Sequence, residues 1–387
     1  MKKRLRIVVV GTLASDPYAG MAWMHMQIAA GLRRLGHDVY YFETTSAWPY
    51  DPVRATHVGD SDYALRYLKY VANGFGLGDR WAYRRSYSDK EWFGLNRNSA
   101  EEWLAHADAV FNIAGATRFA EEGLKVGRLV YFGTDPGHHE ILFARGDEET
   151  RSLMHEHQDF VTYGENIGQP ECMIPALPRI RTIRQPVLLD TWRSATPTKN
   201  EFTTVGNWRQ SGDIEFAGQT YYWSKHHEFL KFIDVPRLTA QSIEFATGLG
   251  DLAPDERQLL ESNHWRLVDA HVFTTDPWRY RDYVRSSRGE FTVAKDLNVQ
   301  LRSGWFSERS ACYLAAGRPV ITQNTGFGTR LPTGEGLFSF DTKEEILAAF
   351  DAITCDYERH SRAAYEIAAQ YFAAEKVLAK LINDLGL

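Results

Sequence analysis

The chain has 387 residues, of which 44% are hydrophobic and 24% charged, a composition typical of ordinary folded domains. At roughly 150 residues per domain this length predicts two or three domains, each able to bury a core without disulfides or metals. The 44 basic residues against 50 acidic ones give a net charge of −6, which argues against duplex DNA as a partner.

The start of the chain and its cysteines bear on location. Basic residues precede a short apolar run that Arg6 interrupts, which is too short for a signal peptide, and no apolar run approaches the ~18 residues of a membrane-spanning helix. The three cysteines lie far apart in sequence, at Cys172, Cys312 and Cys355, which fits a reducing compartment. We therefore expect a cytoplasmic protein with no integral membrane segment.

The first elements follow a strand, helix, strand order. Residues 5–10 are rich in β-branched side chains without polar alternation, which is typical of a strand buried on both faces. After a loop over residues 11–20, apolar residues recur at helical spacing over 21–35, and Gly36 suits a left-handed helix end. Residues 39–43 then form a second strand, so the pattern predicts a parallel α/β sheet.

The loop after the first strand lacks the dinucleotide-binding pattern of three spaced glycines, because Thr-Leu-Ala-Ser-Asp follows Gly11. This argues against a nicotinamide or flavin enzyme. Gly20 lies directly before the helix, where it would let a ligand approach the free backbone N–H groups beside Met21. The alternative is a simple loop glycine.

Alternation of strands and helices continues and then restarts. Further strands of the first domain are predicted at 109–113, 128–132 and 160–163. Residues 181–200 lack periodicity and contain two prolines, which indicates a linker. Beyond it, strands are predicted at 202–205, 242–246 and 266–268, with helices between them. We therefore expect one domain over 1–185 and a second α/β domain over 186–358.

The most informative stretch is Ser303-Gly-Trp-Phe-Ser-Glu-Arg-Ser-Ala-Cys-Tyr-Leu-Ala-Ala-Gly-Arg-Pro-Val-Ile-Thr-Gln-Asn-Thr-Gly-Phe-Gly. It predicts a loop, a helix with Ser307 as N-cap, a stop at Gly317 and a buried strand from Pro319. A helix N-terminus that presents Ser307 and Arg309 to a cleft would bind an anion. A structural cap with a solvated arginine is the alternative.

This stretch resembles the nucleotide-sugar site of glycosyltransferases with the two-domain GT-B fold, in which Ser-x-Arg-x-x-x-x-Leu-Ala-x-Gly-x-Pro-Val-Ile precedes a glycine-containing loop. Two further segments are similar to the same enzymes in the same order, Leu35-Gly-His-Asp-Val39 near the start and Thr333-Gly-Glu-Gly-Leu-Phe near the end. The general likeness is to the retaining family 1/4-like enzymes, and residues 134–140 and 163–168 resemble uncharacterised members related to the spore-coat type transferases.

The resemblance implies two Rossmann-like domains that face each other across a cleft. It implies an acceptor site on the first domain, a nucleotide-sugar site on the second, and a last helix, about 359 to 385, that crosses back so that 359–387 completes the first domain. The implied activity is transfer of a sugar from a nucleoside diphosphate sugar to a hydroxyl group, with no other cofactor and no metal. The sequence leaves the nucleotide, the sugar, the acceptor, the stereochemical outcome and the oligomeric state open.

Two positions depart from the resemblance. Many retaining members carry glutamates where this chain has Cys312 and Gly304, and a thiol cannot accept two strong hydrogen bonds from a ribose diol. Three explanations remain open: Glu308 or another acid substitutes, the donor is unusual, or activity is lost. Taken alone, Cys312 fits a small buried hydrophobic residue.

Without a metal, a leaving diphosphate must be stabilised by helix N-termini and by arginine or lysine side chains. The cations predicted for this role are Arg209, Lys225, Lys295 and Arg309. The remaining predicted donor-binding residues are Ser307, Glu308, Ser310 and Gly326.

The acceptor is predicted to lie where Asp135, His138 and His139 follow the strand at 128–132, because open α/β sheets bind ligands at the carboxyl ends of their strands. If the enzyme inverts configuration, Asp135 or His138 is the general base; if it retains configuration, the cluster orients the acceptor. His139 is grouped with Gly20 and Met21 as a predicted acceptor or phosphate loop.

Two patterns that could suggest a metal do not predict one. Asp60-Ser-Asp62 lacks a preceding strand, and His155 and His157 lie near the end of a predicted helix, facing different directions.

Two other functions stay open: an epimerase of the same fold that acts on the nucleotide sugar, and a degenerate transferase that binds a nucleotide without catalysis.

Overall fold

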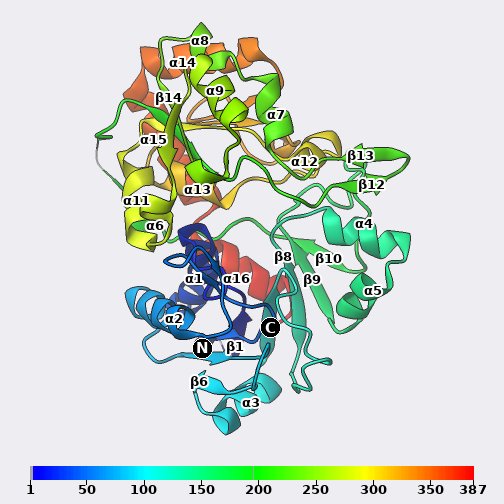
Figure 1. The fold of residues 1–387 in the computed structure, drawn as a ribbon. Coiled ribbons are helices and arrows are strands. Elements are labelled where there is room, and N and C mark those ends of the chain that lie inside the picture. Colours follow the sequence, from blue (N-terminus) through cyan, green and yellow to red (C-terminus); the bar gives the residue numbers. More distant parts are fainter. Residues whose placement is uncertain (1–2, 195) are drawn as a thin grey trace.

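The computed structural model describes residues 3–194 and 196–387, which form two lobes, each built on a mostly parallel sheet (Figure 1). The sheet of the first lobe has eight strands in the order β10-β9-β8-β7-β1-β2-β5-β6. Its strands are β1 (Arg6–Val10), β2 (Asp38–Glu43), β5 (Trp81–Arg84), β6 (Trp92–Gly94), β7 (Ala109–Ile113), β8 (Leu129–Gly133), β9 (Asp159–Thr162) and β10 (Ile180–Thr182). The pairing of β5 with β6 is antiparallel, and the other pairings are parallel.

The predicted first strand is confirmed as β1, and its valines are fully buried because helices cover both faces of the sheet. The helices of this lobe are α1 (Ala19–Arg34), α2 (Asp62–Gly74), α3 (Arg97–His106), α4 (His138–Arg145) and α5 (Glu148–His155). A small hairpin of β3 (Tyr50–Asp51) and β4 (Thr56–His57) lies between β2 and α2 in the chain.

The second lobe has a six-stranded parallel sheet in the order β15-β14-β11-β16-β17-β18. Its strands are β11 (Phe202–Val205), β14 (Ile243–Thr247), β15 (Arg266–Asp269), β16 (Gly289–Thr292), β17 (Val320–Gln323) and β18 (Leu337–Phe340). Its helices are α7 (His226–Lys231), α8 (Val235–Leu238), α9 (Pro254–Ser262), α10 (His271–Thr274), α11 (Pro277–Ser286), α12 (Asp296–Gln300), α13 (Glu308–Ala315), α14 (Lys343–Cys355) and α15 (Tyr357–Tyr371). A hairpin of β12 (Ile214–Phe216) and β13 (Gln219–Tyr221) projects beside α4 of the first lobe (Figure 1).

In each sheet the order in which successive strands are added reverses at one point. In the first sheet the chain runs outward from β1 through β2 and β5, and then from β7 on the other side of β1. In the second sheet β14 and β15 are added on one side of β11, and β16, β17 and β18 are then added on its other side. Such switch points leave a crevice outside the carboxyl ends of the strands, which is where open α/β sheets bind ligands.

The end of the chain differs from the predicted single helix over 359 to 385. It forms two helices, α15 and α16 (Ala374–Asp384); α15 packs on α13 of the second lobe, and α16 packs on α1 (Figure 1). The break lies where the backbone pairs with Val187, whose N–H donates to Phe372 O at 2.7 Å and whose O accepts from Ala374 N at 2.9 Å. The segment that packs on the first lobe therefore begins near residue 374, later than the predicted 359.

The linker after β10 also crosses between the lobes at this point. It includes the short helix α6 (Leu189–Trp192), and Val187 forms a parallel bridge with Ala373. Both covalent connections between the lobes thus run side by side.

Helix α1 anchors the first lobe to the second. Trp23 is fully buried, its indole Nε1 donates to Pro277 O at 2.8 Å, and its ring lies 4.5 Å from that of Trp192 and 5.5 Å from that of Trp278. Gln27, one turn later and also fully buried, contacts α13. Trp23 and Trp192, with Trp278 packed against them, belong to one apolar cluster that spans both lobes.

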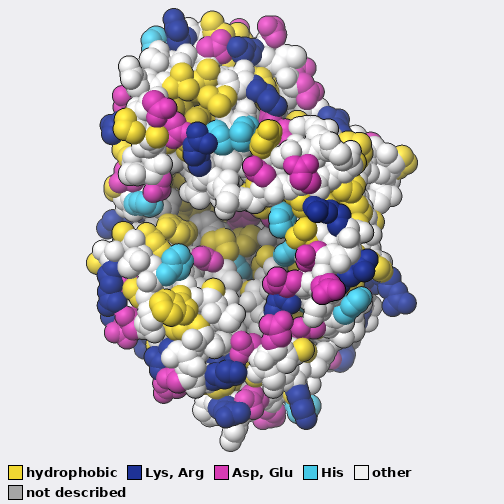
Figure 2. Space-filling view, turned by 45° about the vertical axis from the view of Figure 1, so that its right-hand side comes forward, with side chains coloured by type: hydrophobic (Ala, Val, Ile, Leu, Met, Phe, Trp, Pro, Cys, Tyr) yellow, Lys and Arg dark blue, Asp and Glu magenta, His cyan; other side chains and the backbone are white. Residues whose placement is uncertain are grey.

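Two further contacts join the lobes. Asn166, fully buried in the loop after β9, donates from Nδ2 to the backbone oxygens of Arg302 and Gly326 at 3.3 and 3.1 Å. A separate apolar cluster joins α4 to α12 and to the β12–β13 hairpin through Ile141, Leu297 and Ile214. Figure 2 shows the hollow that remains between the two lobes.

Candidate functional site

The switch point of the second sheet is occupied by an arginine from the predicted helix motif. Arg309 donates from Nη1 to Val205 O, at the end of β11, at 2.6 Å, and from Nη2 to the Thr292 hydroxyl, at the end of β16, at 2.9 Å. Its Nε donates to Glu290 at 2.5 Å, and Glu290 is fully buried. The guanidinium therefore sits across the two central strand ends with its orientation fixed by three acceptors.

Lys295, at the end of the loop that follows β16, reaches the first lobe. Its ammonium forms an ion pair with Asp135 in the β8–α4 loop and lies 3.3 Å from the centroid of a Trp223 ring. The Lys295 side chain is 7% exposed, and burial lowers its pKa, although Asp135 opposes that shift. This ion pair spans the two lobes.

Lys225, directly before α7, is the third cation. Its Nζ lies 5.6 Å from the centroid of a Trp305 ring, and within the described ranges it forms no ion pair. Burial lowers the pKa of Lys225 to about 7, and the charges of Arg309 and Lys295 lower it further in the same direction. With Arg309 paired to Glu290 and Lys295 paired to Asp135, one positive charge remains without a counterion when Lys225 is protonated.

Asp135 has spare hydrogen-bonding capacity. Its Oδ2 accepts from Lys295, while its Oδ1 is buried and has no hydrogen-bond partner in the part of the chain that the structure describes. His138 is the first residue of α4, and its ring lies 5.6 Å from that of Trp223. Burial, together with the charge of Lys295, lowers the pKa of His138, which favours the neutral imidazole.

His139, predicted as part of an acceptor or phosphate loop, lies beside His138, with ring centroids 5.9 Å apart, and faces the sheet. Its Nδ1 lies 2.5 Å from the hydroxyl of Tyr131 on β8, and burial lowers the pKa of His139 to about 4. The reason is helical geometry, since adjacent helix positions point in directions about 100° apart. His139 is therefore part of the packing of α4 on the sheet.

Arg209 is neutralised elsewhere. It pairs with Glu256 of α9 at 2.5 Å, and its Nη1 lies 3.0 Å from Nε2 of His226. Its side chain is 61% exposed. The structure therefore brings together Lys225, Lys295 and Arg309, and it gives Arg209 a carboxylate partner of its own.

The first turn of α13 is only partly available. Ser307 is the N-cap residue, as predicted, but its side chain makes no capping hydrogen bond. Glu308 accepts from Gln27 Nε2 at 2.5 Å and from the Cys312 thiol at 3.2 Å, and burial raises the pKa of Glu308 to about 7. The Ser310 hydroxyl is fully buried without a partner. Helix α1 therefore covers the Glu308 side of the tip, and Arg309 is the residue of this turn that reaches the strand ends.

The two departures from the resemblance have a structural explanation. Gly304 has a φ of +70°, and a Cβ added there would lie 2.7 Å from Cγ of Asn166, so a glutamate cannot occupy this position. Gly326 has a φ of +92°, and its Cβ would lie 2.7 Å from Nδ2 of the same asparagine. Gly326 therefore admits Asn166 to the second lobe. Cys312 is fully buried, as expected for a small hydrophobic residue.

Space is present at the start of α1. The helix begins at Ala19, and a Cβ added at Gly20 would meet no atom within 4 Å. Met21 is half-buried, and its carbonyl oxygen accepts from His25 Nδ1 at 2.7 Å. The N-cap residue Tyr18 makes no side-chain cap. The backbone beside Gly20 is thus open, as the predicted ligand approach requires.

Sequence reasoning did not single out Glu290, Trp223 or Trp305 for the site. Trp305 is fixed across the lobes, since its Nε1 donates to Thr134 O at 3.2 Å. Trp223 stands only two residues before Lys225, yet its ring covers Lys295, far along the chain. No spacing rule signals a contact of that kind. The position of Trp305 inside the helix motif was the one available signal.

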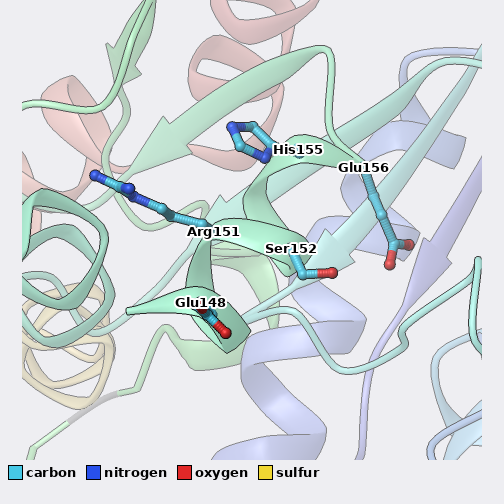
Figure 3. A pocket seen from close by; sticks show the side chains of 5 residues that line it. All are labelled: Glu148, Arg151, Ser152, His155 and Glu156. Carbon is cyan, nitrogen blue, oxygen red and sulfur yellow. The ribbon is translucent and has the colours of Figure 1, made fainter. Parts of the chain in front are cut away.

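The hollow on α5 of the first lobe does not have a convergent lining. A shallow hollow on α5 is lined by Glu148, Arg151, Ser152, His155 and Glu156 (Figure 3). These side chains spread from one helix in different directions, so they do not converge on a ligand.

Within residues 3–194 and 196–387 no three His, Cys, Asp or Glu side chains are close enough to hold a metal ion. No helix in those ranges is long and apolar enough to cross a membrane.

Comparison with known proteins agrees with the architecture. No family model and no curated protein matches the sequence. Solved structures match over nearly the whole chain: Anabaena Alr3699/HepE in complex with UDP-glucose has a TM-score of 0.58 at 12% identity, covering 99% of this chain and 100% of that one. AviGT4, a glycosyltransferase involved in avilamycin A biosynthesis, has a TM-score of 0.53 at 14% identity and coverages of 98% and 96%. The pneumococcal O-GlcNAc transferase GtfA in complex with UDP and GlcNAc has a TM-score of 0.52 at 10% identity, covering 98% of each chain.

The class that these findings define is the GT-B fold of glycosyltransferases, with two Rossmann-like lobes that face each other across a cleft. At identities of 10 to 14% the likeness establishes the fold, and the fold-class prediction is confirmed.

Proposed function

We propose that this protein is a glycosyltransferase that moves a sugar from a nucleoside diphosphate sugar to a hydroxyl group of a small-molecule acceptor. The observation that carries the proposal is the convergence of Lys225, Lys295 and Arg309 at the switch point of the second sheet, opposite Asp135 of the first lobe. The GT-B fold supports it, because HepE and GtfA with this fold were solved with UDP bound.

The chemistry that these residues suit is stabilisation of a leaving diphosphate. Negative charge develops on the oxygen between sugar and phosphate as that bond breaks, and fixed cations in a site of low dielectric stabilise it without a metal ion. Lys225 has no carboxylate partner to give up in the described ranges, so it is the cation most available to the diphosphate. Arg309 and Lys295 share their charge with Glu290 and Asp135.

Asp135 and His138 are the groups proposed to act on the acceptor. The unpartnered Oδ1 of Asp135 can accept a hydrogen bond from an incoming hydroxyl, while Oδ2 stays on Lys295. This places the carboxylate between the acceptor side and the donor side of the cleft. In an inverting reaction it takes the hydroxyl proton, with neutral His138 as the other candidate base; in a retaining reaction both residues orient the acceptor.

The open backbone at Gly20 and Met21 is proposed to lie at the base of the cleft, where the substrate contacts the first lobe. We also propose that the protein works without a metal and in the cytoplasm, and that it binds small molecules and no nucleic acid. The net charge of −6 supports the last point.

A second candidate function is a nucleotide-binding protein without transferase activity. It is favoured by the contact of Gln27 with both Glu308 and Cys312, which covers part of the helix tip expected to bind the donor. Under this alternative the protein binds a nucleoside diphosphate but neither hydrolyses nor transfers the sugar.

The experiment compares nucleotide binding in three proteins by thermal shift and calorimetry with UDP, GDP and TDP. We expect one nucleotide to stabilise the wild type, Lys225→Ala to weaken its binding about tenfold or more, and Arg209→Ala to bind as the wild type does. Product analysis with the corresponding sugar nucleotide then separates transfer from binding alone. A wild type that binds none of the three nucleotides, or a Lys225→Ala variant with undiminished affinity, would contradict the proposal.

A further inference from the structure

The two lysines of the proposed diphosphate site are carried by different segments of the second lobe. Lys225 stands directly before α7, and Lys295 stands directly before α12, in the loop that follows β16. Like charges repel at short range, so two ammonium groups stay near each other only when the backbone that carries them is fixed. Whatever joins these two segments therefore decides the geometry of the site.

A buried glutamine at the end of β17 joins the two segments. The ladder between β16 and β17 ends with β16 itself, at Thr292, so the backbone beyond it leaves the sheet. There the side chain of Gln323 replaces the ladder, since its Oε1 accepts from the N–H of Ala294, the residue before Lys295, at 3.2 Å. The Nε2 of the same amide donates to Glu228 Oε2 of α7 at 2.6 Å. One amide group thus bridges the two segments.

Glu228 connects this amide to the other lysine. It is fully buried in α7, and its backbone N–H donates to Lys225 O at 3.0 Å. Its Oε1 accepts from Lys231 Nζ at 2.6 Å, which leaves Oε2 for Gln323. The Lys231 side chain is 55% exposed and supplies the counterion for this buried carboxylate. The charge of Glu228 is thus balanced by Lys231, and its link toward the cleft runs through neutral amide groups.

The chain is also held on the far side of Lys295. The Lys295 carbonyl oxygen accepts from Asn298 N at 2.9 Å and from Val299 N at 3.1 Å, at the start of α12. Gln323 and Ala294 are both buried, so water does not compete for the bond between them. The backbone around Lys295 is therefore held by α12 on one side and by Gln323 on the other.

We propose that Gln323 is a positioning residue of the diphosphate site and sets the separation of the Lys225 and Lys295 ammonium groups. This role rests on the proposed function, because a diphosphate is a ligand that two cations at a defined separation recognise. Its two phosphate groups share one bridging oxygen and so have a fixed spacing, whereas a single phosphate can bind to one cation. A wrong separation weakens pyrophosphate binding more than it weakens binding of inorganic phosphate.

The test measures binding of pyrophosphate and of inorganic phosphate to the full-length protein by calorimetry. Gln323→Leu removes both hydrogen bonds at similar side-chain volume, and we expect it to weaken pyrophosphate binding about tenfold and phosphate binding about threefold or less. Gln241→Leu is the matched control, because it removes a comparable bond, from Gln241 Nε2 to Asn200 O at 2.6 Å, at the amino-terminal edge of the same sheet. This control should bind both anions as the wild type does.

Two further measurements separate positioning from a general loss of structure. Hydrogen exchange of a peptide over residues 291–299 should quicken about tenfold in Gln323→Leu, because the Ala294 N–H loses its acceptor. The double variant with Glu228→Gln and Gln323→Glu exchanges the amide and the carboxylate between the two positions, so one again donates to the other and Ala294 N keeps an acceptor. It should restore slow exchange and the wild-type ratio of the two affinities.

An unchanged ratio of the two affinities in Gln323→Leu, unchanged exchange over 291–299, or a double variant that exchanges as fast as Gln323→Leu would overturn the inference. A wild type that binds neither pyrophosphate nor UDP, GDP or TDP rejects the proposed function, and the positioning role with it. Wild-type binding that persists undiminished in Gln323→Leu rejects the positioning role alone.

Discussion

Two polar contacts between the lobes, around Gln27 and around Asp135, differ in how fully their hydrogen-bonding groups are satisfied. Around Gln27 every polar group is used: its Oε1 accepts from Leu188 N at 2.9 Å and from Trp192 Nε1 at 3.0 Å, and its amide faces Glu308 and Cys312. Around Asp135 the capacity is incomplete, because the buried Oδ1 finds no hydrogen-bond partner in the described residues. Buried groups without partners are rare, and here they indicate where a ligand belongs.

The contacts of Gln27 hold the lobes together, and the proposed function assigns the chemistry to the Asp135 side. Variants on the two sides should separate stability from binding and turnover.

The largest expected effect is on stability at the Gln27 side. Trp23→Ala removes a fully buried indole and its bond to Pro277, and such losses cost about 3 to 5 kcal/mol. Urea denaturation followed by circular dichroism measures the change. Trp48→Ala is the matched control, since Trp48 is 56% exposed and should alter stability by less than about 0.5 kcal/mol. Similar effects for the two variants would mean that Trp23 does not anchor the lobes.

The next effect is on turnover at the Asp135 side. Asp135→Asn removes the carboxylate offered to the acceptor and should reduce kcat about a hundredfold in an inverting enzyme. The same change removes a negative charge facing Lys295, so the affinity for the nucleoside diphosphate should rise a few-fold. Steady-state kinetics and calorimetry give the two values. Parallel loss of both would indicate a structural role for Asp135 instead.

A smaller effect is expected on the pH dependence of nucleotide binding. The free Lys225 amine has a pKa of about 7, and a bound diphosphate raises it, so binding takes up a proton. Affinity is therefore full below pH 7 and falls as pH rises through 7, by about tenfold between pH 7 and 8.5. Calorimetry in buffers of different ionisation enthalpy detects the proton. Lys225→Arg should bind with a flat profile over this interval, and a flat wild-type profile would refute the assignment.

The smallest expected effect is a difference in stability between alanine variants at two glycines, Gly20 and Gly304. Gly20→Ala should raise stability by about 0.5 kcal/mol, because Gly20 lies in the first turn of α1 with open space beside it. Gly304→Ala should lower stability by about 1 kcal/mol or more, because of its positive φ and the contact with Asn166. Thermal unfolding of both variants measures the difference. If Gly20→Ala also weakens substrate binding, the substrate approaches that backbone.

Local sequence pattern predicted the elements well wherever the signal was itself local. The apolar run of β1, the spacing of α1 and the Ser307-to-Gly317 helix all lie within one element, and the structure places each close to the predicted residues. Three of the four predicted cations also lie near one another: Lys295 follows β16 of the parallel sheet, Arg309 reaches the ends of β11 and β16 from α13, and Lys225 follows the β12–β13 hairpin.

The differences arise from contacts that no local pattern contains. Glu308 is covered by Gln27, a residue 281 positions earlier, and the break between α15 and α16 reflects pairing with Val187 in the linker. Arg209 was predicted from its position after β11, but α9 supplies Glu256 as a partner. In each of these cases the sequence did not reveal the distant partner.

Both covalent connections between the lobes cross at one line, where Val187 runs beside Ala373. A rotation of one lobe against the other about that line would change few backbone angles. Such a rotation would part Lys295 from Asp135 while Lys225 and Arg309, both on the second lobe, kept their mutual arrangement. The product nucleotide could then leave while Lys225 and Arg309 kept their positions, so the cations would already be arranged for the next donor.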